Sequence, residues 1–218
     1  MERKELYIFA DRKRKFNWLN DCARAISVVF MPFLIPLLAF CLLLFCTYLR
    51  IIPINYRLQV ISIVGSFTLV IPVTAIYLFQ KINGWGIRTL SRRERRYVPY
   101  ILTIVSYVTC LVAMYRMHLP RYMTGIIMAS LLCMICCTLI NFRWKISVHV
   151  ASGGLMVGGI VSYCMLFNFN PIGWLSFFIL LSGMLGTARM ILVEHSLWEI
   201  LLGFMTGLFC GIIGILFI

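Results

Sequence analysis

Long apolar runs separated by short polar segments make up most of this chain. The runs cover residues 23–48, 58–79, 100–115, 123–140, 150–167, 172–186 and 196–217. A helix of about 20 apolar residues spans the hydrocarbon core of a bilayer, so runs of this length predict transmembrane helices. No segment alternates with the two-residue period of a half-buried strand. The pattern therefore predicts an all-α fold, a polytopic transmembrane helix bundle with roughly six to seven spans.

Two prolines interrupt the first apolar run, at Pro32 and Pro36. Proline lacks the amide hydrogen that an α-helix uses for its i to i−4 hydrogen bond, and its ring clashes with the preceding turn. We interpret the run as one kinked helix that crosses the membrane once.

The composition supports a membrane protein and decides how the charge is interpreted. Hydrophobic residues make up 62% of the 218 residues, and the net charge is +13. The basic residues flank the apolar runs, which is typical of membrane orientation and of contact with anionic membrane lipids, and argues against a nucleic-acid partner. The sequence predicts a basic cytoplasmic tail over residues 1–22, without a cleavable signal peptide, and a single transmembrane domain over 23–218.

Neither the cysteines nor the glycines predict a cofactor site. Eight of the nine cysteines lie inside apolar runs, where we expect buried thiols. Cys133, Cys136 and Cys137 lack the second pair of ligands that a zinc site needs, so we expect no metal and no cofactor. Glycines recur at small-residue spacing in two runs and predict close helix packing: Gly153, Gly154, Gly158, Gly159, Gly203, Gly207 and Gly211.

Three polar segments, 88–99, 143–149 and 189–199, carry the candidate chemistry. Two predicted spans separate each segment from the next, so all three are expected on one side of the membrane. Together they offer several cations, two histidines and a carboxylate, a combination that suits phosphoryl transfer. Segment 143–149 also precedes a helix, whose N-terminus attracts anions.

The last polar segment has the most specific pattern. His195 and Glu199 are four residues apart, so on one helix they share a face. A carboxylate in that position holds one ring nitrogen and directs the other outward as a base or nucleophile. Arg189 adds a fixed positive charge for an anion.

Simpler interpretations stand beside these. Ser147 can cap a helix, and His118, alone beside a proline, is expected to be interfacial. Arg143 and Lys145 suit contact with lipid headgroups, and Glu194 suits solvation.

These residues resemble the motifs of the type 2 phosphatidic acid phosphatases, a family that shares its fold with vanadium haloperoxidases. The third motif of the family is Ser-Arg, five residues, His, three residues and Asp, and here Arg189, His195 and Glu199 stand in register. The second motif, Pro-Ser-Gly-His, is similar to the segment that contains Ser147 and His149.

The first motif of the family, Lys, six residues and Arg-Pro, is matched in spacing by Arg88 and Arg95. The resemblance covers a phosphatase-like core from about residue 88 to residue 218. It departs from the family in four ways: Glu199 replaces Asp, Ala188 replaces Ser, the Arg-Pro pair is split, and Ile146 and Val148 replace the Pro and Gly of the second motif.

The resemblance implies a division of roles within this site. His195 would attack phosphorus to form a phosphohistidine, Glu199 would orient it, and His149 would protonate the departing oxygen. The phosphate would be bound by Arg189, Ser147 and either Arg88 or Arg95, without a metal.

We therefore expect a membrane phosphatase that hydrolyses a phospholipid or polyprenyl phosphate. The alternative is a non-catalytic membrane protein of the same fold that binds anionic lipid, and a haloperoxidase is the less favoured enzymatic alternative. Sixteen Lys and Arg residues fall on the motif side, against four on the other: Arg50, Arg57, Arg116 and Arg121. This bias predicts a cytoplasmic N-terminus and site in the inner (plasma) membrane, although many relatives of the family face outward.

Overall fold

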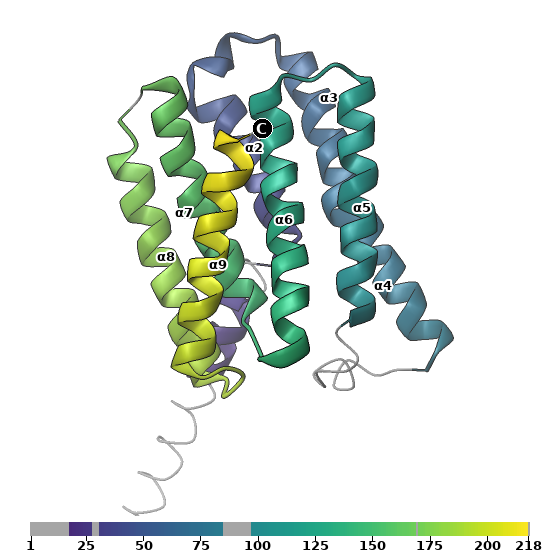
Figure 1. The fold of residues 1–218 in the computed structure, drawn as a ribbon, viewed down its shortest axis with the longest axis vertical. Helices are drawn as coiled ribbons and strands as arrows, with labels where there is room; N and C mark the ends of the chain where they lie inside the picture. Colours follow the sequence, from purple (N-terminus) through teal and green to yellow (C-terminus); the bar gives the residue numbers. More distant parts are fainter. Residues whose placement is uncertain (1–17, 28–30, 85–96, 169, 218) are drawn as a thin grey trace, which may run out of the picture.

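The computed structural model describes residues 18–27, 31–84, 97–168 and 170–217, and the regular structure among them is helical (Figure 1). Six helices of this described part are long and apolar enough to cross a membrane. They extend over Ile54–Ile82, Tyr97–Arg116 (α5), Arg121–Arg143 (α6), Val148–Phe167 (α7), Ile172–Ile191 (α8) and Leu197–Leu216 (α9). The predicted all-α transmembrane class is confirmed, and the chain is an integral membrane protein.

The first apolar run does not form the single kinked helix that its sequence predicts. Residues 18–27 are helical, and α2 covers only Leu34–Cys46, 13 residues or about 20 Å. A turn containing Pro32 precedes α2, and the Pro32 carbonyl accepts a hydrogen bond from the Tyr107 hydroxyl of α5 at 3.4 Å. Figure 1 shows residues 18–27 in the lower half of the bundle and α2 above them. Two helices thus replace the single one, because proline interrupts the hydrogen-bond ladder.

The next span also changes its helical geometry beside a proline. It contains α3 (Ile54–Gly65), a π-helical turn over Ser66–Val70, and α4 (Ile71–Ile82). Pro72 has no amide hydrogen to donate to the carbonyl four residues earlier. That carbonyl belongs to the π-helical turn, which ends two residues before Pro72. The Phe67 carbonyl in this turn accepts a hydrogen bond from the Ser106 hydroxyl of α5. Figure 1 shows the resulting bend between α3 and α4.

Helix α7 lies at the centre, and its backbone touches that of α9. A Cβ placed on Gly211 of α9 would lie 2.6 Å from the Leu155 carbonyl oxygen, and a Cβ on Gly207 would overlap the Ala151 carbonyl. Gly154 and Gly158 of α7 meet the backbone of α9 in the same way. The prediction of glycine-mediated helix packing is confirmed, because only hydrogen fits between these backbones.

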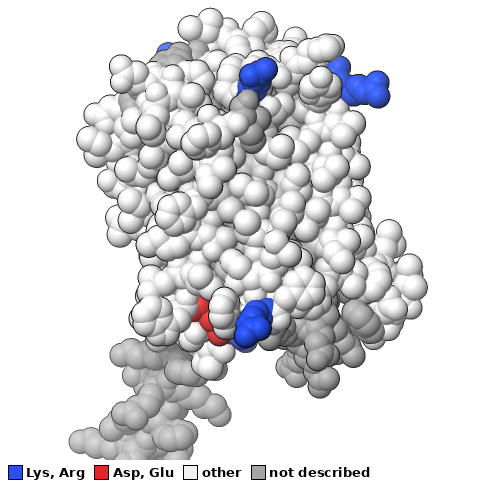
Figure 2. Space-filling model, in the orientation of Figure 1, with Lys and Arg blue, Asp and Glu red and all other residues white. Residues whose placement is uncertain are grey.

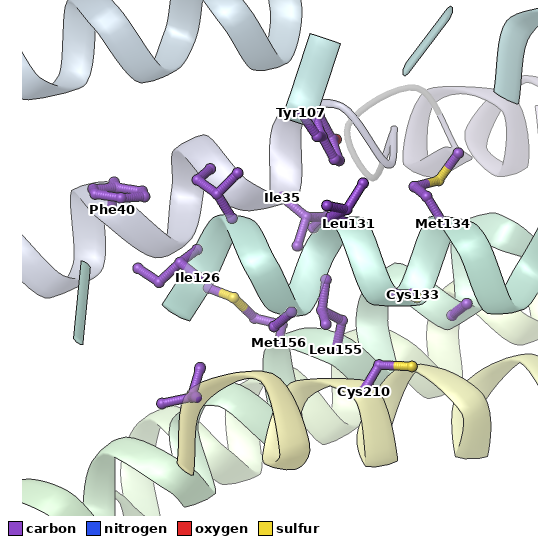
Figure 3. Packing of buried hydrophobic residues seen from close by; sticks show 14 of the residues in the cluster. Ile35, Phe40, Tyr107, Ile126, Leu131, Cys133, Met134, Leu155, Met156 and Cys210 are labelled. Carbon is purple, nitrogen blue, oxygen red and sulfur yellow. The ribbon is translucent and has the colours of Figure 1, made fainter. Parts of the chain in front are cut away.

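An apolar core surrounds this helix pair. Figure 3 shows the core between α2, α6, α7 and α9, with Tyr107 reaching it from α5. Four cysteines are buried as expected, but Cys46 at the end of α2 is exposed, and three others of the apolar runs are partly exposed: Cys41, Cys136 and Cys164.

The outer surface suits a bilayer. On the face drawn in Figure 2, the charged residues of the described part lie near the two ends of the bundle, and a broad uncharged band separates them. Large apolar side chains are exposed on the outer helices, among them Val105, Leu180 and Phe209. Lipid chains can solvate such a band, whereas water cannot do so at low cost.

Candidate functional site

Four helix ends meet at one end of the bundle, which we call the site end. There α6 ends at Arg143, α7 begins at Val148, α8 ends at Ile191 and α9 begins at Leu197. Both described polar segments with candidate chemistry, 143–149 and 189–199, therefore emerge on one side, as the span count predicts.

The first polar segment is described only in its last residues. Arg88 and Arg95 lie outside the described residues. Tyr97, the first residue of α5, stacks on Phe142 with ring centroids 4.7 Å apart, and its hydroxyl donates to the Asn141 carbonyl at 3.2 Å. Helix α5 thus begins at the site end.

His195 and Glu199 form the central contact of the site. The Nδ1 atom of His195 lies 2.7 Å from Oε2 of Glu199. The imidazole is almost fully buried, with 2% of its side chain exposed, whereas 26% of the Glu199 side chain is exposed. His195 precedes the N-cap residue Ser196, and Glu199 lies in the first turn of α9. The expected contact between these two residues, four positions apart in the sequence, is confirmed. The catalytic role of each residue stays a prediction.

A strained turn brings His195 into place. The Val193 amide donates to Met190 and the Glu194 amide donates to Arg189, which together form a Schellman motif at the end of α8. Val193 occupies the left-handed position of this motif, with φ of 55°, where glycine is usual. A β-branched residue there costs about 1–2 kcal/mol, so the turn keeps a strained conformation. Strain of this kind concentrates at functional sites.

The same turn pairs Arg189 with Glu194. The Nη2 atom of Arg189 lies 2.9 Å from Oε2 of Glu194, and Lys145 Nζ donates to the Glu194 backbone carbonyl. The expectation that Glu194 is merely solvated is therefore wrong, because its carboxylate binds the buried guanidinium. The Lys145 ammonium thus contacts the protein backbone at Glu194. Arg143 is exposed, as a residue facing headgroups would be.

Ser147 does not cap its helix through its side chain. It occupies the N-cap position of α7, yet its hydroxyl makes no capping hydrogen bond. The Oγ atom is buried and has no hydrogen-bond partner among the described residues. The backbone amide of Ser147 donates to the Glu199 carbonyl at 3.4 Å and joins α7 to α9. A buried hydroxyl left without a partner costs roughly 1–3 kcal/mol, so a bound oxygen acceptor would stabilise this end of α7.

His149 lies at the second position of α7 and is half-buried. Its carbonyl accepts a hydrogen bond from the Ser152 hydroxyl at 2.6 Å. A Cβ on Gly203, in the second turn of α9, would lie 2.7 Å from the Ser147 carbonyl oxygen, so the start of α7 is in backbone contact with α9. The two histidines therefore belong to adjoining helix starts.

Electrostatically, this end of the bundle favours an anion. Neither Ser147 nor Ser196 caps its helix through the side chain, so the first amides of α7 and α9 retain donor capacity. Two helix dipoles with their positive ends together attract negative charge. Lys145 and Arg189 add positive charge nearby, and Glu194 and Glu199 add negative charge. This arrangement can bind a phosphate beside the His195–Glu199 pair.

The third histidine is elsewhere. His118 lies exposed, with φ of 51°, in the turn between α5 and α6 at the opposite end of the bundle. Within the described residues, no three His, Cys, Asp or Glu side chains are grouped to hold a metal ion.

Comparison with models of known protein families, with curated proteins and with solved structures found no match to this chain. The interpretation of the site therefore depends on its residues and their geometry.

Proposed function

We propose that this protein is a membrane phosphatase that hydrolyses a phospholipid or polyprenyl phosphate through a phosphohistidine. The observation that carries the proposal is the 2.7 Å contact between His195 Nδ1 and Glu199 Oε2 beside two uncapped helix starts. A nucleophile oriented by a carboxylate, next to a site that favours anions, is the arrangement that phosphoryl transfer needs.

The reaction has two steps. Because Glu199 holds Nδ1, Nε2 of His195 attacks phosphorus while the bond between phosphorus and the ester oxygen breaks. His149 gives its proton to that departing oxygen, which leaves as an alcohol. Water then attacks the phosphohistidine, His149 takes up a proton from this water, and inorganic phosphate leaves with His195 regenerated.

Arg189 and Ser147 are the described residues that we assign to phosphate binding. The guanidinium stabilises the charge on the equatorial oxygens, and the Ser147 hydroxyl donates to one of them. Arg88 or Arg95 would add a further cation. A lipid substrate is favoured because the site lies at one end of an apolar helix bundle.

Purified protein in detergent tests the proposal with phosphatidic acid, phosphatidylglycerophosphate and polyprenyl diphosphate, each with EDTA present. We expect release of inorganic phosphate from at least one substrate. The variant His195→Ala should release none, whereas His118→Ala is the matched control and should match the parent. Equal activity of His195→Ala and the parent would contradict the phosphohistidine route.

Two observations favour a second candidate function, a non-catalytic protein that binds anionic lipid. The imidazole of His195 is almost fully buried, and Arg189 already has a carboxylate partner in Glu194. Absence of phosphate release from every substrate, together with saturable binding of anionic lipid in vesicles, would favour this candidate.

We also propose the inner (plasma) membrane as the location and the cytoplasm as the side that the site faces. The basic residues of the sequence support this orientation, because cytoplasmic segments are enriched in Lys and Arg. Residues 18–27, which follow the basic N-terminal segment in the sequence, occupy the half of the bundle that holds the site end (Figure 1).

A further inference from the structure

An apolar groove of about 300 Å³ lies between α8 and α9. Its lining residues recur every three or four positions along α8 and along α9, so each helix lines the groove with one face. Val150 of α7 also lines the groove. The lining residues of α8 and α9 are Ile179, Ser182, Gly183, Gly186, Thr187, Met190, Leu197, Ile200, Leu201 and Phe204.

Small residues line the groove on the α8 side. Its floor consists of buried residues that include Ser182, Gly186 and Ile200, and Gly183 forms part of the exposed rim. A Cβ on Gly183 would meet nothing within 4 Å, so the groove is open there to the surroundings of the bundle. In a membrane those surroundings are lipid chains.

The groove begins at the site end. Met190 directly follows Arg189, and Ile200 directly follows Glu199, so one end of the groove adjoins the candidate phosphate site. From Met190 the groove follows α8 to Ile179, eleven residues or about 16 Å towards the membrane centre. A lipid in the leaflet nearest the site has this arrangement, with its charged group at the surface and its chain directed inward.

We propose that this groove binds one hydrocarbon chain of the phosphate-ester substrate, with the chain between α8 and α9 and the phosphate at Arg189. The inference rests on the proposed function and names the part of the site that selects the substrate. Charge complementarity supports this occupant, because the positive ends of two helix dipoles and the Arg189–Glu194 pair lie at one end of the groove and uncharged, mostly apolar residues line the rest. Neutral membrane lipids lack the anionic group that would anchor them there.

A second cavity, of about 210 Å³, does not fit the same ligand. It lies between α2, α6, α7 and α9 and includes Thr47, Asn170 and Trp174 near the opposite end of the bundle. None of the described residues that line it is charged, so it offers no counter-charge for a phosphate.

Two glycines of α8 provide a matched pair of variants. Gly183 is in the groove, Gly173 is outside it, and neither would bring an added Cβ within 4 Å of another atom. Gly183→Leu should fill the groove, whereas Gly173→Leu should add the same side chain elsewhere on the helix. The measured quantity is the selectivity for long chains, which is kcat/KM for long-chain phosphatidic acid divided by kcat/KM for a water-soluble phosphomonoester. We expect Gly183→Leu to lower this ratio about tenfold. Gly173→Leu should leave this ratio unchanged.

A binding measurement separates this inference from the proposed function. Phosphatidic acid with a diazirine near the end of one acyl chain is photolysed with the purified protein, and the labelled residues are mapped by mass spectrometry. The groove is supported if labelling falls within 179–190 or 197–204. Unlabelled phosphatidic acid and Gly183→Leu should both suppress this labelling, whereas Gly173→Leu should not. Such labelling in a protein that releases no phosphate would overturn the proposed function and leave the groove standing.

Three results would overturn the groove even if the protein is an active phosphatase. They are labelling confined to other helices, labelling that Gly183→Leu does not reduce, and equal suppression by phosphatidylcholine, which lacks a terminal phosphate.

Discussion

The guanidinium of Arg189 lies 2.9 Å from the carboxylate of Glu194, across the turn that joins α8 to α9. A bound phosphate and this carboxylate would compete for the same cation. We therefore expect Glu194→Gln to strengthen competitive inhibition by inorganic phosphate roughly fivefold, which corresponds to about 1 kcal/mol. Inhibition constants measured in detergent check this expectation. Glu194→Asp keeps the charge and should stay closer to the parent, and weaker inhibition of Glu194→Gln would show that the pair supports phosphate binding.

Glu199 should act on turnover more than on binding. Glu199→Gln keeps the shape of the side chain but removes the negative charge that orients His195 and stabilises positive charge on it. We expect kcat to fall about 10³-fold with little change in KM. Steady-state kinetics on the best substrate measure both constants, with Glu199→Asp as the control that retains a carboxylate. A kcat within twofold of the parent would remove Glu199 from the mechanism.

His149 should matter most for substrates with poor leaving groups. An alkyl alcohol needs a proton as it departs, whereas p-nitrophenolate leaves without one. We expect His149→Ala to slow hydrolysis of phosphatidic acid about 10²- to 10⁴-fold and that of p-nitrophenyl phosphate much less. His118→Ala, in the turn at the opposite end, is the control. Because His149 also acts in hydrolysis of the phosphohistidine, the two substrates are compared by kcat/KM, which reports formation of that intermediate. An equal fall of kcat/KM for both substrates would contradict proton donation by His149.

Val193 should limit the stability of the turn before His195. Its φ of 55° is unfavourable for a β-branched residue and ordinary for glycine. We expect Val193→Gly to raise the free energy of unfolding by about 1 kcal/mol. Thermal unfolding in detergent measures the change, and Val193→Ala should gain less because it keeps a Cβ. A lower Tm for Val193→Gly than for the parent would refute the strain at this position.

The proposed orientation predicts different labelling of two exposed positions. Asn83 follows α4 at the end of the bundle where α5 begins, and His118 lies at the opposite end. In a protein without native cysteines, His118→Cys should react with an impermeant thiol reagent in intact cells, whereas Asn83→Cys should react only after lysis. The reverse pattern would place the site on the outer side.

Several features of the fold are predictable because they depend on local chemistry. Apolar run lengths predict the spans from α5 to α9, and the spacing of His195 and Glu199 predicts their contact. The break before α2 is less predictable, because Pro32 is compatible with either a kink or a new helix. Contacts with other helices favour the new helix, and one of them is the hydrogen bond from the Tyr107 hydroxyl to the Pro32 carbonyl.

The pairing of Arg189 and Glu194 could not be predicted from their spacing. They are five positions apart in the sequence, which on a continuous helix would direct their side chains apart. They meet because Val193 adopts a left-handed conformation, which sequence rules assign to glycine or asparagine. Similarly, Ser147 occupies the N-cap position that its sequence suggests, but its hydroxyl does not make the expected hydrogen bond.

The backbone contact between α7 and α9 has a mechanical consequence for the site. Gly207 and Gly211 leave no side chain between the two helices, so no rotamer change at these positions can alter the separation of the two backbones. This contact joins the start of α7, which carries His149, to the start of α9, which His195 directly precedes. A groove separates α8 from α9, so we expect the movement that admits a substrate to occur in α8, the helix that carries Arg189.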